Sequence, residues 1–384
     1  MNLKEYIEKE NLILPDYSNL NIVDLVSTLY SRYGVDIKKN ENIKKLDKII
    51  PNKNHTVLIL IDGMGSNLVS LLDDNSLIKN NKIDDMLTVS PSSTACVLTS
   101  LATAKYPSEH GIIGWYNYNR KFDITYLPLL FIDRKNNKSL SEYNIKSSDI
   151  FIKESKLNNL KVKTTVLYHE NICNSTYSNY VANNRTAYKS IEDAFDKIID
   201  IISINNETFT YLYISDIDDL EHDNGYNHPK VIEKLTYIDS QIKRLENIKD
   251  VTTIITADHG QTNVKNDIIM DFNKYNKYFY AYPGIDYGMV TYYVKKGMEK
   301  EFETEFNNNY QNQLFLFKTE EFIDLNIFGP NNNNIISNLG EYISLCNQDS
   351  YLVNDVNIEE YVGKTKGNHS GLTKDEMIIP LIVI

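Results

Sequence analysis

Aspartate and histidine residues recur in this sequence close to the ends of short apolar runs. They are Asp62, Asp218, His222, Asp258, His259 and His369. Carboxylate oxygens and neutral imidazole nitrogens are good ligands for Zn²⁺, and ligand type alone leaves Mn²⁺ open. Thr94 precedes a helical pattern, and the positive end of a helix dipole favours an alkoxide that could act as a nucleophile. This combination has the chemistry that a two-metal phosphoryl-transfer site needs.

Each motif also has an ordinary structural explanation. Asp62-Gly63 could be a turn after a strand, and the segment 91–94 could cap a helix. The acidic residues around Asp218 could form a solvated loop, and a lone histidine such as His369 in a glycine-rich turn usually has no chemical role. The functional interpretation therefore depends on the joint occurrence of three aspartates, three histidines and one threonine.

The spacing within two of the motifs favours shared ligation. Asp218 and His222 are four residues apart, which places both on one face of a helical turn. Asp258 and His259 are neighbours, and neighbours within a strand point to opposite faces of the sheet. They can reach one ion only where the chain has left the sheet, and Gly260 permits such a turn.

Short apolar runs alternate with helical patterns along most of the chain. The runs cover residues 57–61, 163–167, 209–214, 251–256 and 378–384, and the helical patterns cover 22–33, 95–103, 190–202 and 229–245. Continuous apolar strands separated by helices predict an α/β fold with a mostly parallel sheet and helices on both faces. Ligands bind at the carboxyl ends of the strands in such sheets, where the motifs above lie.

The stretch 283–345 interrupts this alternation. It is strand-like at 289–294, helical at 298–307 and strand-like again at 314–317. We expect a small inserted α+β cap at 283–345, with a catalytic core formed by residues 1–282 and 346–384.

The composition excludes several classes of protein. The 384 residues include 40 Lys and Arg against 52 Asp and Glu, and the resulting charge of −12 argues against general nucleic-acid binding. The chain shows neither an apolar amino-terminal run nor a stretch of roughly 20 apolar residues, so we expect a cytoplasmic protein without a membrane span. Cys96, Cys173 and Cys346 are far apart and odd in number, and we expect them to be small buried apolar residues.

The order of the motifs resembles the alkaline phosphatase superfamily, and within it the type I phosphodiesterase/nucleotide pyrophosphatase family. The resemblance runs through most of the chain and is carried by Asp62-Gly63, Thr94, Tyr106-Pro107, His110-Gly111-Ile112, Tyr213, Asp218, His222, Gly225, Asp258-His259-Gly260 and His369. It implies an alkaline phosphatase-like core and a metal-dependent hydrolase of phosphodiester or pyrophosphate bonds in nucleotide-like substrates.

The resemblance also implies a role for each matching residue. One zinc ion would be held by Asp218, His222 and His369, and a second by Asp62, Asp258, His259 and Thr94. Thr94 would be the nucleophile and form a phosphothreonine intermediate, which water then releases.

The sequence departs from the family pattern beside the nucleophile. Related diesterases carry an asparagine three residues after His-Gly-Ile, whereas this chain has Trp115 there and Asn117 two residues further on. We expect both to contact substrate, with Trp115 offering an aromatic face to a base. Ile217 and Glu221 replace the usual Pro and Gly around Asp218, which bears on loop shape rather than on ligation.

A charge count favours a diester substrate over a monoester. Two dications balance three aspartates and a threonine alkoxide, so the assembled site is close to neutral and suits a monoanionic diester. A dianionic monoester would need a further cation, which Arg120 or Lys105 could supply only by folding back. The expected partner is a small phosphate ester, with nucleotides among the candidates. The alternatives are a phosphomonoesterase, phosphonate hydrolase or phosphomutase of the same superfamily, or a binding protein that kept the fold.

Overall fold

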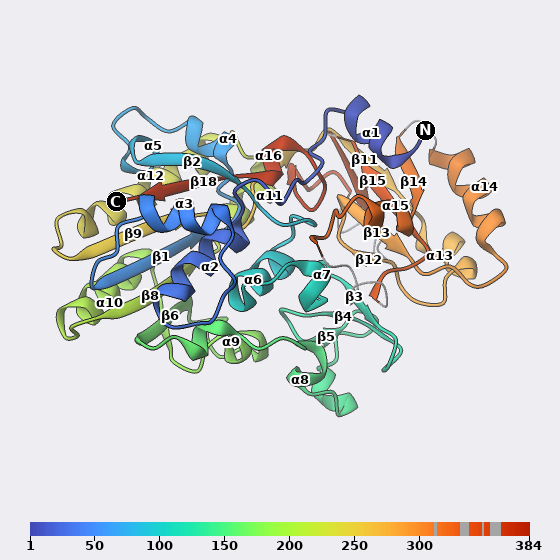
Figure 1. Cartoon of the computed structure of the whole chain (residues 1–384). Coiled ribbons are helices and arrows are strands. Elements are labelled where there is room, and N and C mark those ends of the chain that lie inside the picture. Colours follow the sequence, from blue (N-terminus) through green and yellow to red (C-terminus); the bar gives the residue numbers. More distant parts are fainter. Residues whose placement is uncertain (311–312, 331–337, 348, 354–361) are drawn as a thin grey trace.

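A seven-stranded sheet forms the centre of the molecule, and this computed structural model confirms the predicted α/β fold. The structure describes residues 1–310, 313–330, 338–347, 349–353 and 362–384. The strand order is β2-β18-β9-β1-β8-β6-β7 (Figure 1). The strands are Lys82–Leu87 (β2), Ile378–Val383 (β18), Val251–Thr256 (β9), His55–Ile61 (β1), Thr208–Ile214 (β8), Lys163–His169 (β6) and Arg185–Tyr188 (β7).

The sheet is mostly parallel, as the apolar runs predicted. The strands β9, β1, β8, β6 and β7 run parallel to one another, and β18 is antiparallel to both β9 and β2. Every position of β1 and β8 is buried, so this part of the sheet is covered on both faces. The apolar runs did not reveal β2, because its sequence KIDDML is half exposed at the sheet edge.

Helices pack around this sheet. The four helical patterns of the sequence are confirmed as α2 (Ile22–Arg32), α6 (Thr94–Thr103), α10 (Ile191–Ser203) and α12 (Pro229–Glu246). Proline suits the first position of α12 because the first N–H groups of a helix have no partner within it. The other helices near the sheet are α3 (Glu41–Ile49), α4 (Ser66–Ser70), α5 (Leu77–Asn80), α9 (Thr176–Val181), α11 (Asp216–Asn224) and α16 (Lys374–Met377).

A second lobe lies beyond the carboxyl ends of the parallel strands (Figure 1). Its antiparallel sheet has the order β12-β13-β15-β14, with strands Gly284–Ile285, Met289–Tyr292, Tyr342–Cys346 and Leu314–Lys318. The helices α14 (Glu299–Tyr310) and α15 (Thr319–Asp324) belong to the same part of the chain. The strand, helix and strand predicted within 283–345 are therefore confirmed as β13, α14 and β14.

Elements from outside 283–345 also join the second lobe. Leu3 and Tyr6 of α1 (Leu3–Lys9) pack into one hydrophobic cluster with Ile343 of β15. The strand β11 (Asn266–Ile269) pairs in parallel with β16 (Ser350–Val353) beside this lobe. The elements of the described chain not yet given bounds, together with β11 and β16, are α7 (Pro107–His110), β3 (Asn117–Asn119), β4 (Ile124–Leu127), β5 (Ile132–Asp133), η1 (Leu140–Tyr143), α8 (Ser147–Ile150), η2 (Lys156–Asn159), β10 (Thr262–Asn263), β11 (Asn266–Ile269), α13 (Phe272–Tyr275), η3 (Asn276–Tyr278), β16 (Ser350–Val353) and β17 (Gly367–Asn368).

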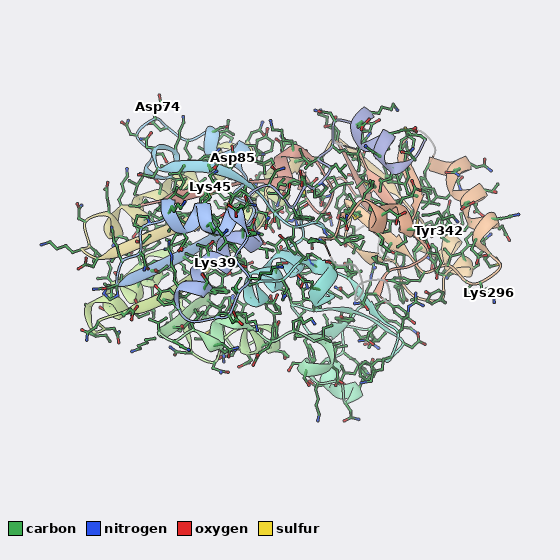
Figure 2. The ribbon with its side chains drawn as sticks, viewed as in Figure 1. Lys39, Lys45, Asp74, Asp85, Lys296 and Tyr342 are labelled. Carbon is green, nitrogen blue, oxygen red and sulfur yellow. The ribbon has the colours of Figure 1, made fainter. Side chains whose placement is uncertain are left out.

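Charged side chains cover the outside of the molecule (Figure 2). Lys45 of α3 pairs with Asp84 of β2 at 3.0 Å, and Asp74 pairs with Lys79 at 2.8 Å. Such exposed pairs contribute only about 0–1 kcal/mol each. All three cysteines are free and buried, as predicted. Among the helices that the structure describes, none has the length and apolar character needed to cross a bilayer.

Candidate active site

Three aspartates lie where neighbouring parallel strands end. Asp62 directly follows β1, Asp258 lies two residues beyond β9, and Asp218 is in the first turn of α11, just after β8. Since β1 lies between β8 and β9 in the sheet, the three carboxyl groups meet at one edge. The chain leaves the sheet before Asp258, which is the condition under which Asp258 and its neighbour His259 can reach the same ion.

The first group of potential ligands consists of Asp62, Asp258 and His259. One ligand atom of each lies within 4.8 Å of the other two. The Nε2 atom of His259 is 3.5 Å from Asp62 Oδ1 and 3.5 Å from Asp258 Oδ2. Thr94 Oγ1 lies 3.2 Å from the same nitrogen. The structure therefore brings together all four residues that the sequence assigned to one ion.

The second group consists of Asp218, His369 and again His259. Asp218 Oδ1 is 3.9 Å from His369 Nε2, and Asp218 Oδ2 is 3.4 Å from His222 Nε2. The rings of His259 and His369 stack with their centroids 3.9 Å apart. The structure thus places His222 against Asp218, as its spacing on α11 predicted, but outside the most compact set of ligand atoms. His259 lies in both groups, which the sequence did not indicate.

Backbone carbonyl groups fix the orientation of all three histidine rings. The Nδ1 atom of His222 is 2.9 Å from Gly367 O, that of His369 is 2.8 Å from Ser92 O, and that of His259 is 3.1 Å from Gly260 O. A ring that donates from Nδ1 to a carbonyl presents Nε2 as a lone pair. Each Nε2 faces the carboxylates, so the three rings are oriented as metal ligands.

Two buried carboxylate oxygens in the first group have no hydrogen-bond partner. They are Asp62 Oδ1 and Asp258 Oδ2. The other oxygens are satisfied, because Tyr213 donates to Asp62 Oδ2 and the backbone N–H groups of Gly63 and His259 donate to Asp258 Oδ1. Unpaired buried anionic oxygens are costly unless a cation compensates them. Since both oxygens face His259 Nε2, the residues present fit a divalent cation.

The pKa shifts of the site reflect the same crowding of negative charge. Burial raises the pKa of Asp62, and the Asp258 and Asp218 carboxylates raise it further. Burial also raises the pKa of Asp258 to about 6. Burial lowers the pKa of His259 and of His369 to about 4, so both rings are neutral near pH 7.

Asp218 and His222 form the exception to this trend. Burial works against ionisation of Asp218, but the neighbouring His222 and His369 outweigh it and lower its pKa. Burial likewise opposes protonation of His222, but the Asp218 carboxylate outweighs it and raises the pKa to about 9. Without a metal, His222 therefore carries the proton that a bound ion would displace.

Thr94 is the first residue of α6, and its position is fixed from two sides. The preceding Ser93 has extended backbone dihedrals, which place Thr94 at the positive end of a ten-residue helix. The neighbouring Ser92 donates to the buried carboxylate of Glu376 at 3.0 Å, and Glu376 also accepts from the N–H groups of Gly371 and Thr373. Glu376 therefore joins the segment before Thr94 to the loop that follows His369.

Two glycines allow the ligand-bearing turns to approach each other. A Cβ atom on Gly260 would lie 2.7 Å from the Cα of Gly65 and 2.2 Å from the backbone oxygen of Asp375. Gly63 has a φ of +79°, and a Cβ there would meet Glu221 Oε2 at 2.6 Å. The buried Glu221 thus packs on the Asp62 turn and takes no part in either ligand group, in agreement with its predicted effect on loop shape.

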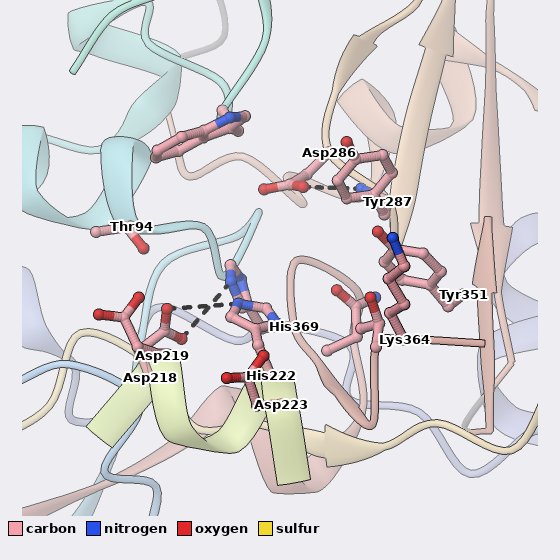
Figure 3. Close-up of a pocket in the computed structure, with 13 residues that line it drawn as sticks. Thr94, Asp218, Asp219, His222, Asp223, Asp286, Tyr287, Tyr351, Lys364 and His369 are labelled. Atoms are coloured by element: carbon pink, nitrogen blue, oxygen red, sulfur yellow. Dashed lines mark hydrogen bonds and ion pairs between the residues drawn. The ribbon is translucent and has the colours of Figure 1, made fainter. Parts of the chain in front are cut away.

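A pocket of about 340 Å³ opens over these groups, between the central sheet and the second lobe (Figure 3). Its lining includes Thr94, Asp218, His222 and His369 of the predicted site, together with Trp115. The sequence analysis missed the rest of the lining, namely Asp219, Asp223, Asp286, Tyr287, Tyr351, Lys364, Thr365 and Asn368. Asp219 and Asp223 lie beside Asp218 and His222 on α11 but were given no role there. No motif marked the other six residues, because their contact with the site depends on the tertiary fold.

Asn117 is not among the residues that line the pocket. Its Oδ1 accepts from the N–H of Ile113 at 2.8 Å, and its Nδ2 donates to Gly114 O at 2.6 Å. Its side chain is fully buried and holds the turn that carries Trp115. The structure therefore gives Asn117 a role in loop shape, and its contact with substrate stays a prediction.

The two cations that could have served a monoester lie away from the pocket lining. The guanidinium of Arg120 donates to Leu339 O at 3.1 Å and lies over the ring of Tyr280, and Lys105 pairs with Glu109 at 2.8 Å. Among the described residues of the lining, Lys364 is the single lysine or arginine.

Comparisons with known proteins identify the class to which this fold and site belong. The sequence profile of the Type I phosphodiesterase/nucleotide pyrophosphatase family matches residues 56–305, more than half of the chain. The protein is therefore a hydrolase of the phosphodiesterase/nucleotide pyrophosphatase class. It belongs to the type I phosphodiesterase/nucleotide pyrophosphatase family. A comparison with curated protein sequences finds no match.

Solved structures share the fold at low sequence identity. Human ectonucleotide pyrophosphatase/phosphodiesterase 5 is 18% identical with a TM-score of 0.65, covering 85% of this chain and 87% of its own. The murine protein of the same name is 16% identical with a TM-score of 0.63, with the same coverage. Phosphonoacetate hydrolase from Sinorhizobium meliloti 1021 is 15% identical with a TM-score of 0.59, covering 87% of this chain and 91% of its own. The alkaline phosphatase-like fold is thereby confirmed.

Proposed function

We propose that this protein hydrolyses phosphodiester or phosphoanhydride bonds in small nucleotide-like substrates, with Thr94 as the nucleophile and two zinc ions as cofactors. The observation that carries the proposal is the position of Thr94 Oγ1, 3.2 Å from His259 Nε2. His259 belongs to both ligand groups, so the hydroxyl lies beside the point where the two groups meet.

The site would hold two ions. Asp62, Asp258, His259 and Thr94 would bind one, and Asp218 and His369 of the second group would bind the other together with the adjacent His222. Bound divalent ions stabilise charge on the attacking and leaving oxygens of an in-line displacement. Carboxylate and imidazole donors also bind Mn²⁺, but Zn²⁺ is the more typical metal for sites rich in histidine.

Thr94 carries the covalent chemistry in this proposal. Its hydroxyl proton passes to the leaving oxygen, and Oγ1 attacks phosphorus while the bond to that oxygen breaks. This step gives a free alcohol or phosphate and a phosphothreonine at position 94 that still carries the other ester group. Water then attacks this phosphorus, one of its protons restores the Thr94 hydroxyl, and the phosphate monoester is released. The N-terminus of α6 favours the negative charge that develops at Thr94.

The charges around Thr94 support a diester as substrate. Asp62, Asp218, Asp258 and a Thr94 alkoxide would neutralise two dications, which leaves no excess positive charge for a dianionic monoester. Arg120 and Lys105 are engaged elsewhere. An inactive variant of the murine relative is described in complex with AMP, and the phosphonoacetate hydrolase in complex with phosphonoacetate. Those complexes support a small phosphate-bearing ligand in this fold.

The experiment compares turnover of bis-p-nitrophenyl phosphate and p-nitrophenyl phosphate after chelation and readdition of zinc or manganese. We expect zinc-dependent turnover with preference for the diester, and its loss in Thr94→Ala. Thr103→Ala, at the other end of α6, serves as the matched control and retains turnover. A preference for the monoester would move the assignment to a phosphatase. Undiminished turnover by Thr94→Ala would remove the proposed nucleophile.

A further inference from the structure

Asp286 places a buried carboxylate beside the nucleophile from the second lobe. It lies on the turn between β12 and β13 and is 7% exposed. Its Oδ2 accepts from Ser93 Oγ at 2.9 Å, and its Oδ1 accepts from the N–H of Tyr287 at 2.9 Å. Ser93 directly precedes Thr94, so Asp286 is bonded to the residue next to the nucleophile. Both Asp286 and Thr94 line the same pocket (Figure 3).

The backbone holds this turn in an unusual conformation. Ile285 has a φ of +72°, which is costly for a β-branched residue. Two backbone hydrogen bonds with Tyr116, of 2.8 Å and 2.7 Å, compensate it, and Gly114 leaves room because a Cβ there would lie 2.6 Å from Ile285 O. The loop that carries Trp115 is thereby tied to the residue before Asp286. The second lobe thus fixes Asp286 against the nucleophile loop.

Within the described part of the chain, the carboxylate of Asp286 accepts hydrogen bonds from two neutral donors and lies near the site histidines. Among the residues that the structure describes, no lysine or arginine pairs with it. Burial raises its pKa, and its interactions with His369, Ser93, Tyr287 and His222 oppose that shift. The pocket also contains Asp219 and Asp223, against Lys364 as its single described lysine. A negative side chain at this place is unfavourable for a ligand that brings more than one negative charge.

We propose that Asp286 is a specificity-determining residue that selects phosphodiesters carrying one negative charge, with an ester group that is neutral or cationic. Its carboxylate repels a second negative charge on the bound phosphate and attracts a positively charged ester group. Trp115, Tyr287 and Tyr351 line the same pocket, and aromatic faces bind quaternary ammonium groups favourably. This inference rests on the proposed phosphodiesterase function and narrows its substrate class.

The test uses three substrates that release the same p-nitrophenolate. They are p-nitrophenyl phosphate, bis-p-nitrophenyl phosphate and p-nitrophenyl phosphocholine, whose second substituent is absent, neutral and cationic respectively. kcat/KM is measured for the zinc-loaded wild type and for Asp286→Asn. We expect the ratio of monoester to neutral diester to rise about tenfold in the variant, which is about 1.4 kcal/mol. The ratio of choline ester to neutral diester falls severalfold.

Two further variants separate charge from hydrogen bonding. Ser93→Ala removes the 2.9 Å hydrogen bond to Asp286 but keeps the Asp286 carboxylate. We therefore expect kcat/KM for all three substrates to change by the same factor, so that their ratios remain unchanged. Asp74→Asn removes a charge at a surface position far from the second lobe and changes neither rates nor ratios (Figure 2). If Asp286→Asn does not fold, Asp286→Ala provides the same charge comparison, with inhibition of wild type and variant by inorganic phosphate as a second readout.

The outcomes distinguish this inference from the proposed function. A wild type that turns over none of the three substrates with metal bound would overturn the proposed function and this inference with it. A wild type that hydrolyses the diester, together with unchanged ratios in Asp286→Asn, would overturn the inference alone. So would a folded Asp286→Asn that is inactive towards all three, because Asp286 would then be required for turnover and not for selection.

Discussion

The floor and the wall of the active site are built in different ways. The floor consists of Asp62, Asp218, Asp258, His259 and His369, at the carboxyl ends of the central strands and the loop before β18. The wall consists of Trp115, Asp286, Tyr287, Tyr351 and Lys364. Asp258 and His259 are fully buried, whereas Lys364 is exposed and Trp115 and Tyr287 are half-buried.

We infer from this difference that the floor carries out the chemistry and the wall determines substrate selectivity. Backbone groups hold the floor, because carbonyl oxygens orient its histidine rings and N–H groups donate hydrogen bonds to one oxygen of Asp258. Wall side chains come from loops and from strand β16, at places far apart in the sequence. We therefore expect floor substitutions to abolish turnover of every substrate, and wall substitutions to change which substrate is preferred.

The largest effect is expected from Asp258→Asn. The amide keeps an acceptor for the N–H groups of Gly63 and His259 but loses the charge that faces His259 Nε2. Turnover of bis-p-nitrophenyl phosphate should fall by at least 10³-fold, on the order of losses seen when a catalytic unit is broken. Asp216→Asn, on α11 and paired with Lys234, is the control. Near-normal turnover by Asp258→Asn would remove Asp258 from the floor.

The second largest effect is expected at Glu376, whose hydrogen bonds support the loops that carry Thr94 and His369. Glu376→Ala leaves the N–H groups of Gly371 and Thr373 without their acceptor. It also removes the shorter of two hydrogen bonds available to Ser92 Oγ, 3.0 Å against 3.3 Å to Gly371 O. We expect a loss of about 1–3 kcal/mol in the free energy of unfolding and a 10- to 100-fold loss in turnover, roughly as for other residues that orient ligands. Denaturant unfolding and kcat measurements check both. The neighbouring Asp375→Ala should change neither quantity strongly, and equal effects of the two would contradict a specific role of Glu376.

The sequence predicted the floor because its residues follow recognisable strands. Asp62 and Asp258 stand next to short, β-branched apolar runs typical of buried strands, and the spacing of Asp218 and His222 is that of a helical turn. The sharing of His259 by both groups could not be predicted, since it depends on the stacking of His259 on His369. The wall was missed for a similar reason. Asp286 reaches Ser93, next to Thr94, because β12 docks on the loop at Tyr116, a contact between residues far apart in the sequence.

The pH dependence of zinc binding should report the charge crowding of the floor. Asp258, with a pKa raised by burial to about 6, holds a proton below that pH, and His222 holds one up to about pH 9. Bound metal displaces these protons. Zinc affinity should therefore rise with pH up to about pH 9, and more steeply below pH 6, where Asp258 also holds a proton. Calorimetric titrations in buffers of different ionisation enthalpy count the released protons, and an affinity independent of pH would contradict the shifts.

A smaller effect is expected from the wall residue Trp115. Trp115→Ala should raise KM for the p-nitrophenyl ester of thymidine 5′-phosphate by roughly fivefold to tenfold, because stacking of a base on this half-buried ring should contribute about 1 to 1.4 kcal/mol, the lower part of the usual range for such stacking. KM for methyl p-nitrophenyl phosphate and both kcat values should change little. Trp115→Phe keeps an aromatic face and should behave like the wild type. An equal loss for both substrates would indicate that Trp115 does not contact a base.

The most direct test of the whole account is the zinc stoichiometry of the chelated wild type, measured together with recovery of bis-p-nitrophenyl phosphate turnover. The two ligand groups predict two zinc ions per chain, with full turnover only after both have bound. Asp258→Asn should bind one ion and stay inactive. Full turnover by the metal-free protein, or by a protein that binds a single ion, would contradict a two-metal floor.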